Sequence, residues 1–364
     1  MYSSILRPLL FRFNSDTVHE STIKWASFAS RSKLCLSCIK ALYDYQAPAL
    51  KQEIAGLAFR NPVGLAAGFD KNGTLVPLME ALGFGFTEVG SITASANTGN
   101  PKPRSFRLPK DLSLINRMGL NNDGAATVTK RLKNYENNIP IGINIAKTNN
   151  PEISGEDALE DYRTSFLAAV DVADYITINI SCPNTEEGKT FEEPETLSAL
   201  LAHLEIGKDL TQPPVFVKFS ADIESVLLEE LIDITRHYSV NGYVISNTSS
   251  LRDGLTTPKS TLKKIGRGGL SGSAIREKST RLIRLVHRLT RGEKPIIGVG
   301  GILTVQDALE KIRAGADLIQ IYTGMVYEGP GLVQKINKGI VRYLREEGLE
   351  HVYQIRKKSP LIES

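Results

Sequence analysis

Short apolar runs recur along most of this chain, and each is followed by a polar or glycine-rich loop and then by a stretch with helical periodicity. The runs are rich in β-branched residues and almost continuously apolar, which is typical of parallel strands buried on both faces. We predict eight strands, at residues 62–69, 86–92, 139–147, 174–181, 214–220, 242–248, 295–302 and 318–325. The helical stretches between them include residues 158–172, 194–210, 223–237, 274–289 and 304–314.

This alternation predicts an α/β fold in which helices cover a parallel sheet. Eight such units match a closed (β/α)8 TIM barrel better than an open sheet. The alternative is a doubly wound sheet, but the chain has no early G-x-G-x-x-G motif of the kind that such sheets use for dinucleotides. We therefore expect the barrel at residues 51–350, followed by a basic C-terminal tail at residues 351–364.

Residues 1–50 precede the predicted barrel and are expected to form an amphipathic helical extension. Helical patterns cover residues 4–13 and 23–45, and residues 44–49 are the expected linker. Lysines and arginines among the apolar positions favour either binding to a membrane surface or capping of the open bottom of the barrel, and the pattern leaves both open. No apolar run is long enough to predict a membrane-spanning helix, and the first 15 residues lack the features of a secretory signal.

Composition and charge exclude several functional classes. The 364 residues are 41% hydrophobic and 23% charged, which is ordinary for a globular protein. A net charge of +4, a single Trp and the absence of a Lys/Arg block argue against nucleic-acid binding. Three cysteines argue against a disulfide framework. Cys35 and Cys38 form a C-x-x-C pair without a second pair or nearby histidines, so we expect helix residues and no metal site.

In a TIM barrel, functional residues lie at the C-terminal ends of the strands. Gly300 and Gly301 end the seventh predicted strand, and Thr323 and Gly324 end the eighth. Turns of this kind are typical of the phosphate site of barrels, where backbone N–H groups and a helix N-terminus surround the anion. The alternative is that these glycines only permit tight turns. Lys218 interrupts the fifth strand, which is costly unless it faces an anion such as a phosphate or a reduced flavin.

The fourth predicted strand runs into the segment NISCPN at residues 179–184. The proline ends the strand and leaves the thiol of Cys182 between two amides. None of the five histidines ends a strand, so imidazole and zinc catalysis are not expected and Cys182 is the candidate base. A lone Asn is usually a turn residue, but several strand-end amides predict a site for a planar substrate with several carbonyl groups. The candidates are Lys71, Asn116, Asn179, Asn184, Asn247 and Thr248.

Several long motifs, all in order, resemble the dihydroorotate dehydrogenase family. They are NPVGLAAGFDKNG at residues 61–73, GNPKPRSFRL at 99–108, INRMGLNN at 115–122, GGLSG at 268–272 and IGVGGI at 297–302. The resemblance covers nearly the whole chain, to about residue 344. The N-terminal segment also resembles the helical pair of the membrane-associated, quinone-using class 2 branch. The resemblance implies FMN as cofactor, dihydroorotate as substrate, orotate as product, and a role in pyrimidine biosynthesis.

The resemblance also implies the site residues, position by position. FMN is expected to contact Ala67, Gly68, Lys71, Ser91, Asn144, Asn179, Lys218, Ser246, Gly272, Gly301, Tyr322 and Thr323. Dihydroorotate is expected to contact Lys71, Asn116, Arg117, Met118, Gly119, Leu120, Asn179, Asn184, Asn247 and Thr248. Cys182 takes the position of the catalytic base, and His19 and Arg107 take positions in the quinone tunnel.

Two residues depart from the class 2 pattern. Class 2 enzymes usually carry serine at the position of Cys182 and phenylalanine at that of Leu120, and cysteine is usual in the soluble class 1 branch. Because the extension is the part that forms a quinone tunnel, we expect a quinone as acceptor. The alternatives are a soluble acceptor (fumarate or NAD) and another FMN-barrel dihydropyrimidine oxidoreductase. The class 2 resemblance implies a monomer bound peripherally to the cytoplasmic side of the cell membrane, without nucleic acid or metal.

Overall fold

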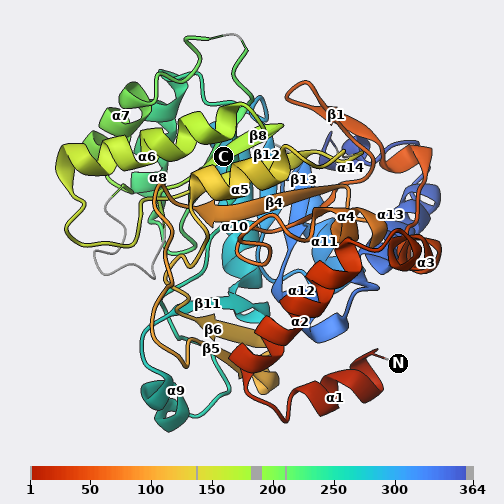
Figure 1. Cartoon of the computed structure of the whole chain (residues 1–364). Coiled ribbons are helices and arrows are strands. Elements are labelled where there is room, and N and C mark those ends of the chain that lie inside the picture. The colour runs from red at the N-terminus through yellow and green to blue at the C-terminus, as the bar shows by residue number, and fades with distance from the viewer. Residues whose placement is uncertain (1, 137, 182–190, 210, 358–364) are drawn as a thin grey trace.

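A closed barrel of eight parallel strands forms the centre of the molecule (Figure 1). The computed structural model describes residues 2–136, 138–181, 191–209 and 211–357. The barrel strands are β3 (Val63–Leu65), β4 (Phe86–Ile92), β7 (Ile141–Ile145), β8 (Tyr175–Asn179), β9 (Val215–Phe219), β10 (Gly242–Ile245), β12 (Ile296–Val299) and β13 (Leu318–Ile321). All eight predicted strands are confirmed. The doubly wound alternative was wrong, because the last strand, β13, pairs with the first, β3.

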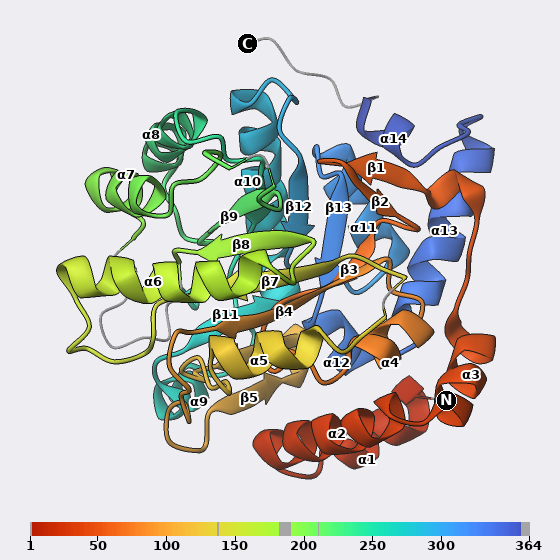
Figure 2. The ribbon, with the colours of Figure 1, turned by 45° about the horizontal axis from the view of Figure 1, so that its top comes forward.

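Helices surround the barrel (Figure 2). Those around it are α4 (Val76–Ala81), α5 (Ala125–Leu132), α6 (Gly155–Val170), α7 (Pro194–His203), α8 (Ser225–Arg236), α10 (Arg276–Leu289), α11 (Val305–Arg313), α12 (Thr323–Glu328), α13 (Leu332–Glu346) and α14 (Tyr353–Lys357), whereas α9 (Lys259–Ile265) lies beside the small sheet described below. The predicted helices at 158–172, 223–237, 274–289 and 304–314 are confirmed with small shifts of their ends. The helix predicted at 194–210 ends early, at His203, since Glu205 adopts a positive φ of 51°.

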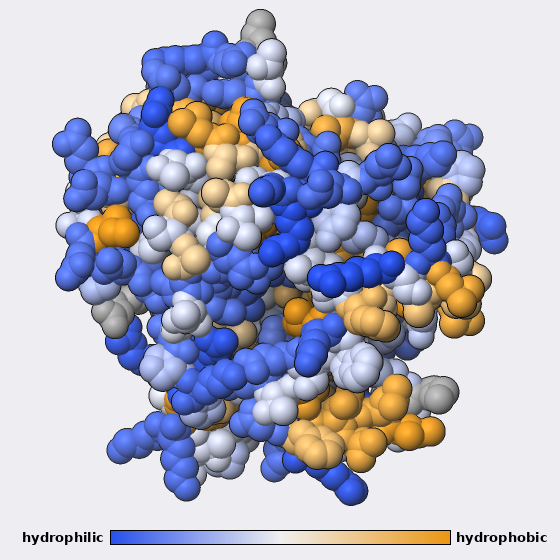
Figure 3. Space-filling view, viewed as in Figure 1, coloured by the Kyte–Doolittle hydropathy of each residue, from blue (hydrophilic) through white to orange (hydrophobic). Residues whose placement is uncertain are grey.

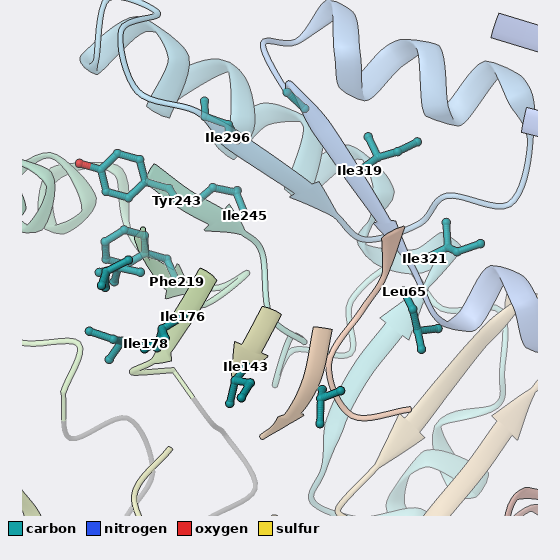
Figure 4. Packing of buried hydrophobic residues seen from close by; sticks show 14 of the residues in the cluster. Leu65, Ile143, Ile176, Ile178, Phe219, Tyr243, Ile245, Ile296, Ile319 and Ile321 are labelled. Atoms are coloured by element: carbon teal, nitrogen blue, oxygen red, sulfur yellow. The ribbon is translucent and has the colours of Figure 1, made fainter. Parts of the chain in front are cut away.

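The core has two parts, one on each side of the strands. Outside the barrel, side chains such as Ile176, Ile178 and Phe219 come from neighbouring strands (Figure 4) and are fully or almost fully buried. Inside the barrel, Phe86 and Tyr175 belong to a separate aromatic cluster. These interior rings take the space beside glycines of neighbouring strands, and a Cβ at Gly64 or Gly142 would lie within 2.5 Å of them. The barrel interior is therefore packed and is not a channel.

A short antiparallel hairpin, β1 (Gln52–Ile54) with β2 (Leu57–Phe59), closes the N-terminal end of the barrel. The Phe59 ring packs edge-on against Phe86 with 5.3 Å between centroids, and the hairpin residues join the interior aromatic cluster. Because this hairpin covers the bottom of the barrel, the hypothesis that the N-terminal helices cap it was wrong.

The N-terminal helices lie instead beside α4, α12 and the sheet described below (Figure 2). A π-helix (Tyr2–Leu6) leads into α1 (Arg7–Leu10), α2 (Ser15–Ser30) and α3 (Lys33–Tyr43). The single helical pattern expected at 23–45 was wrong in its bounds. Asn14 caps the start of α2, and Ser32 accepts a hydrogen bond from the N–H of Cys35 to start α3. None of the helices in the described ranges is long and apolar enough to cross a bilayer.

A three-stranded antiparallel sheet, which the hydrophobic pattern did not predict, adjoins the barrel. It consists of β5 (Ser105–Leu108), β6 (Ser113–Asn116) and β11 (Gly269–Gly272), with β6 in the middle. Residue Asn116 lies opposite both Ser105 and Gly269. Among the described residues, 3-10 turns lie at Pro48–Leu50, Pro109–Asp111 and Ser273–Ile275. The pairing of Asn116 with Gly269 brings together the motifs INRMGLNN and GGLSG, which are about 150 residues apart in sequence.

The described part of the C-terminal segment packs against the barrel. Val352 and Ile355 are almost fully buried, and the N–H of Val352 donates to the carbonyl of Ala49 at 2.9 Å. This contact ties the end of the described chain to the segment that leads into β1.

Candidate active site

One cavity of about 510 Å³ extends from the C-terminal ends of the barrel strands to the N-terminal helices. Its inner part is lined by the ends of β3, β4, β8, β9, β10, β12 and β13, and its side by β6 and β11. Its outer part is lined by apolar side chains of α1, α2 and α3, including Leu10, Val18 and Ala26. The elements that the sequence places far apart therefore enclose a single continuous space.

The structure brings nearly all the predicted site residues to this cavity. Every described residue predicted to contact FMN, dihydroorotate or the quinone lines it, except Asn144 and Arg117. Asn144 lies directly behind the lining and is hydrogen bonded to Ser91. The Arg117 guanidinium donates to the carbonyl of Arg267 at 2.9 Å and lies over the Phe106 ring, on the far side of β6 and β11. Cys182 and Asn184 lie outside the described residues.

A chain of hydrogen bonds orients the amides at the strand ends. Asn179 donates from Nδ2 to Ser91 Oγ at 3.0 Å and accepts at Oδ1 from Asn247 Nδ2 at 3.1 Å. Asn247 Nδ2 also lies 3.1 Å from Ser181 Oγ. Each amide thus has a defined direction, because an amide nitrogen only donates and its oxygen only accepts. Thr248 lines the cavity, and its buried hydroxyl has no hydrogen-bond partner among the described residues.

The turns after β12 and β13 form the end of the cavity next to β11. Gly300 and Gly301 have φ values of +119° and +75°, and Gly272 has +97°. A Cβ at Gly301 would lie 2.4 Å from the Cβ of Arg276, so only glycine fits this position. Together with the start of α12 at Thr323, these turns lie where TIM barrels bind a phosphate through backbone N–H groups.

Two basic side chains in the cavity have strongly altered proton affinity. Burial lowers the pKa of Lys71 to about 8, with a further contribution from Arg104. Burial also lowers the pKa of His19 to about 3, helped by Lys71 and Arg104. His19 is therefore neutral at physiological pH and can both donate and accept a hydrogen bond. Its ring packs edge-on against Phe69, which in turn packs edge-on against Tyr322 at 5.4 Å.

Arg107 on β5 fastens the first N-terminal helix to the cavity wall. Its guanidinium donates to the carbonyls of Leu10 and Phe13 and lies 4.5 Å from the centre of the Phe11 ring. At the other end of this helix, Tyr2 Oη donates to the carbonyl of Val326 at 2.7 Å. Arg107 thus has a structural role in addition to its place on the cavity wall.

Sequence reasoning missed several residues of this site. Glu88 is a fully buried carboxylate inside the barrel, hydrogen bonded to Asn144 at 2.8 Å. A charged residue within the apolar run at 86–92 was the available signal, as it was for Lys218. Gln320 and Arg104 were missed because their roles depend on partners far away in sequence. In the described ranges, no three His, Cys, Asp or Glu side chains come together as metal ligands would.

Comparisons with known proteins agree with this geometry. Residues 49–344 match the family described as dihydroorotate dehydrogenase. A relative from Synechococcus sp. (strain JA-3-3Ab), named dihydroorotate dehydrogenase (quinone), is 41% identical over 350 residues, covering 93% of this chain and 92% of that protein. Another of the same name, from Chloroflexus aurantiacus (strain ATCC 29366 / DSM 635 / J-10-fl), is 42% identical over 349 residues, covering 93% and 95%.

Solved structures extend the similarity to the whole fold. The crystal structure of ligand-free DHODH from Eimeria tenella has a TM-score of 0.82 and 30% identity, covering 94% of this chain and 99% of that chain. The complex of the Eimeria tenella enzyme with ferulenol has a TM-score of 0.80 and 31% identity, covering 90% and 96%. The family match over most of the chain, the curated relatives and the shared fold lead to one conclusion: this chain belongs to the dihydroorotate dehydrogenase family.

Proposed function

We propose that this protein oxidises (S)-dihydroorotate to orotate in pyrimidine biosynthesis, with FMN as the first electron acceptor and a quinone as the terminal one. The observation that carries the proposal is the single cavity that joins the polar strand ends to the apolar space between α1, α2 and α3. A polar substrate and an apolar acceptor thus find chemically different parts of one cavity that meet at the same centre. The names of the curated relatives support the same reaction and acceptor.

The residues present fit FMN. The glycine turns at Gly272, Gly300 and Gly301 line the cavity, and the backbone N–H groups of such turns are donors that suit a phosphate. Lys218 offers a buried ammonium, which suits the negative charge that a flavin ring gains on reduction. Ser91, Asn179 and Ser246 line the space between these two features. When bound, FMN supplies the acceptor for the hydrogen and electron pair that leave C6 of dihydroorotate.

The protein's own groups bind the substrate and remove its proton. Lys71, Asn116 and Asn247 hold the carboxylate and carbonyl groups of dihydroorotate against the flavin. Cys182 takes the proton from C5, a role that rests on its place in the sequence, because it lies outside the described residues. A thiol has a reference pKa of about 8.5, so this base needs less activation at neutral pH than a serine hydroxyl would.

The quinone enters between the N-terminal helices. Val18, Thr22 and Ala26 on α2 line this part of the cavity, and the neutral His19 offers a hydrogen bond to a quinone carbonyl. Exposed apolar side chains support peripheral attachment of these helices to a membrane that supplies the quinone. Figure 3 shows apolar surface gathered over α1 at the lower right and over α3 at the right edge. The most exposed large apolar residues of the N-terminal helices and the turns beside them are Ile5, Leu9, Phe13, Trp25, Phe28, Leu34 and Leu42.

The test is an assay of dihydroorotate oxidation with a ubiquinone analogue, fumarate or NAD in parallel. We expect turnover with the quinone only. The Ala26→Trp variant fills the space between the helices and should keep the quinone out of reaction distance. It should therefore lose at least about 10-fold in quinone turnover, because rates depend steeply on the placement of the reactants. Dihydroorotate should still bleach the flavin under anaerobic conditions. Lys24→Trp, on the same helix but exposed, is the matched control. Turnover with fumarate or NAD would instead assign the soluble acceptor.

A further inference from the structure

The residue that the proposed reaction leaves unexplained is Glu88. Its side chain on β4 is completely buried inside the barrel, below the cavity. Burial of a carboxylate costs several kcal/mol unless donors and a counter-charge surround it. An apolar side chain would pack inside the barrel without that cost, so the carboxylate requires a reason.

Every polar group around Glu88 is a donor. Oε1 accepts from Asn144 Nδ2 at 2.8 Å and lies 3.8 Å from Lys218 Nζ. Oε2 accepts from Gln320 Nε2 at 2.7 Å and from the hydroxyls of Tyr175 and Thr177 at 3.3 Å each. Burial and the nearby Glu88 charge raise the pKa of Tyr175 well above its usual value, so this phenol keeps its proton and donates. Nitrogen and hydroxyl donors thus contact both oxygens of the buried carboxylate.

Glu88 sets the direction of the amide chain above it. Because Asn144 Nδ2 donates to Glu88, its Oδ1 faces Ser91 and accepts from the Ser91 hydroxyl. That hydroxyl is then free to accept from Asn179 Nδ2, and Asn179 Oδ1 accepts from Asn247. The chain therefore runs without interruption from the barrel interior to the substrate end of the cavity.

Glu88 also balances the charge at the cofactor end. Within the described ranges, Glu88 is the carboxylate paired with Lys218, and the two side chains are 0% and 6% exposed. With the pair intact, the two charges at the cavity floor cancel. Without the carboxylate, an uncompensated cation would lie at the cavity wall, and little water would screen it.

We propose that Glu88 is a positioning residue of the cofactor site, which fixes the direction of the Asn144 amide and limits the positive charge that Lys218 presents to the flavin. The inference rests on the proposed FMN-dependent function. It predicts that Glu88 sets the balance between the oxidised and reduced cofactor, because reduced FMN carries a negative ring charge and the oxidised form does not.

The experiment measures the midpoint potential of FMN in the holoenzyme, without substrate, in Glu88→Gln, Lys218→Met and the double variant. Glu88→Gln should favour reduced FMN at least 10-fold relative to wild type, which is a rise of about 30 mV for a two-electron couple. Lys218→Met should shift the potential in the opposite direction. The double variant should return close to wild type, because the two charges are removed together.

Asp317→Asn is the matched control. Asp317 is also a buried carboxylate, at the start of β13, and pairs with Arg356 at 2.8 Å away from the cavity. The Asp317→Asn variant should leave the midpoint potential of FMN unchanged. If Glu88→Gln fails to fold, a double variant that folds and binds FMN supports the charge pairing, since it leaves no unpaired buried charge. A wild-type potential in Glu88→Gln, or an equal shift in Asp317→Asn, overturns the inference. Wild-type protein without FMN would instead overturn the proposed function.

Discussion

At the scale of single residues, the site depends on the direction of a few buried amides. Asn179 joins the cofactor end to the substrate end, because its nitrogen contacts Ser91 and its oxygen contacts Asn247. Its backbone carbonyl accepts from Tyr162 Oη at 2.9 Å, which fixes the strand end that carries it. The strand that orders this amide leads directly into Ser181 and the cysteine that follows.

Replacing Cys182 by alanine tests the proposed base. The variant should still bind FMN but lose at least about 100-fold in the rate of flavin reduction by dihydroorotate, because a positioned base contributes about 10²–10⁴-fold. Anaerobic stopped-flow measurement of flavin absorbance checks this. Cys38→Ala on α3, an exposed thiol, should leave the rate unchanged. Cys182→Ser should retain activity only at higher pH, and reduction of Cys182→Ala at the wild-type rate would contradict the role of the thiol.

At the scale of elements, α2 is held to the barrel by the segment that precedes β5. The backbone N–H of Arg104 donates to the buried Asp16 carboxylate at 2.8 Å, and Ser15 bonds Ser105 at 2.9 Å. The Arg104 guanidinium donates to the carbonyl of Thr98, and its own carbonyl accepts from Arg117 at 2.8 Å. The same short segment therefore contacts both α2, which we propose borders the quinone, and the loop that carries the proposed substrate residues.

Asp16→Ala should loosen this contact. The buried N–H of Arg104 would lose its acceptor, which costs about 1–3 kcal/mol. We expect the KM for the quinone analogue to rise several-fold, while the anaerobic reduction of the flavin by dihydroorotate changes less than about 2-fold, because the amide chain does not include Asp16.

The control for this prediction is Glu20→Gln. Glu20 pairs with Lys102 at 2.6 Å and lies 3.8 Å from the Arg104 guanidinium, but it is 48% exposed, so the loss of these screened ion pairs should have little effect. Equal changes in quinone and dihydroorotate kinetics would show that α2 is not positioned separately from the substrate loop.

At the scale of the whole molecule, the barrel has a closed end and an open end with different surfaces. The β1–β2 hairpin seals the N-terminal end with the Phe59 cluster, whereas the cavity opens toward the N-terminal helices. The same helices carry exposed apolar side chains, with Trp25 and Phe28 71% and 67% exposed. Amphipathic helices with such residues bind at the interface of a bilayer.

The double variant Trp25→Asp/Phe28→Asp should bind vesicles much more weakly than wild type in co-sedimentation, because two charges replace the inserted aromatic rings. Turnover with a water-soluble quinone analogue should remain. Val226→Asp, at a 79% exposed site on α8, introduces the same kind of change away from these helices and should bind like wild type. Equal vesicle binding by all three proteins would contradict docking through α2.

Local sequence was sufficient to predict the repeating strand and helix units, the glycine turns and the polar strand ends, because hydrophobic periodicity and turn chemistry are properties of neighbouring residues. The resemblance of the motifs predicted the family, and the family model matches the chain. Most of the described residues that the resemblance assigns to the site do line the cavity. Tertiary structure alone decided that a hairpin closes the barrel, that β6 meets β11, and that the N-terminal helices line the cavity. It also decided that Glu88 lies against Lys218. These pairings join residues that are far apart along the chain, and local patterns contain no information on which distant partner each residue will meet.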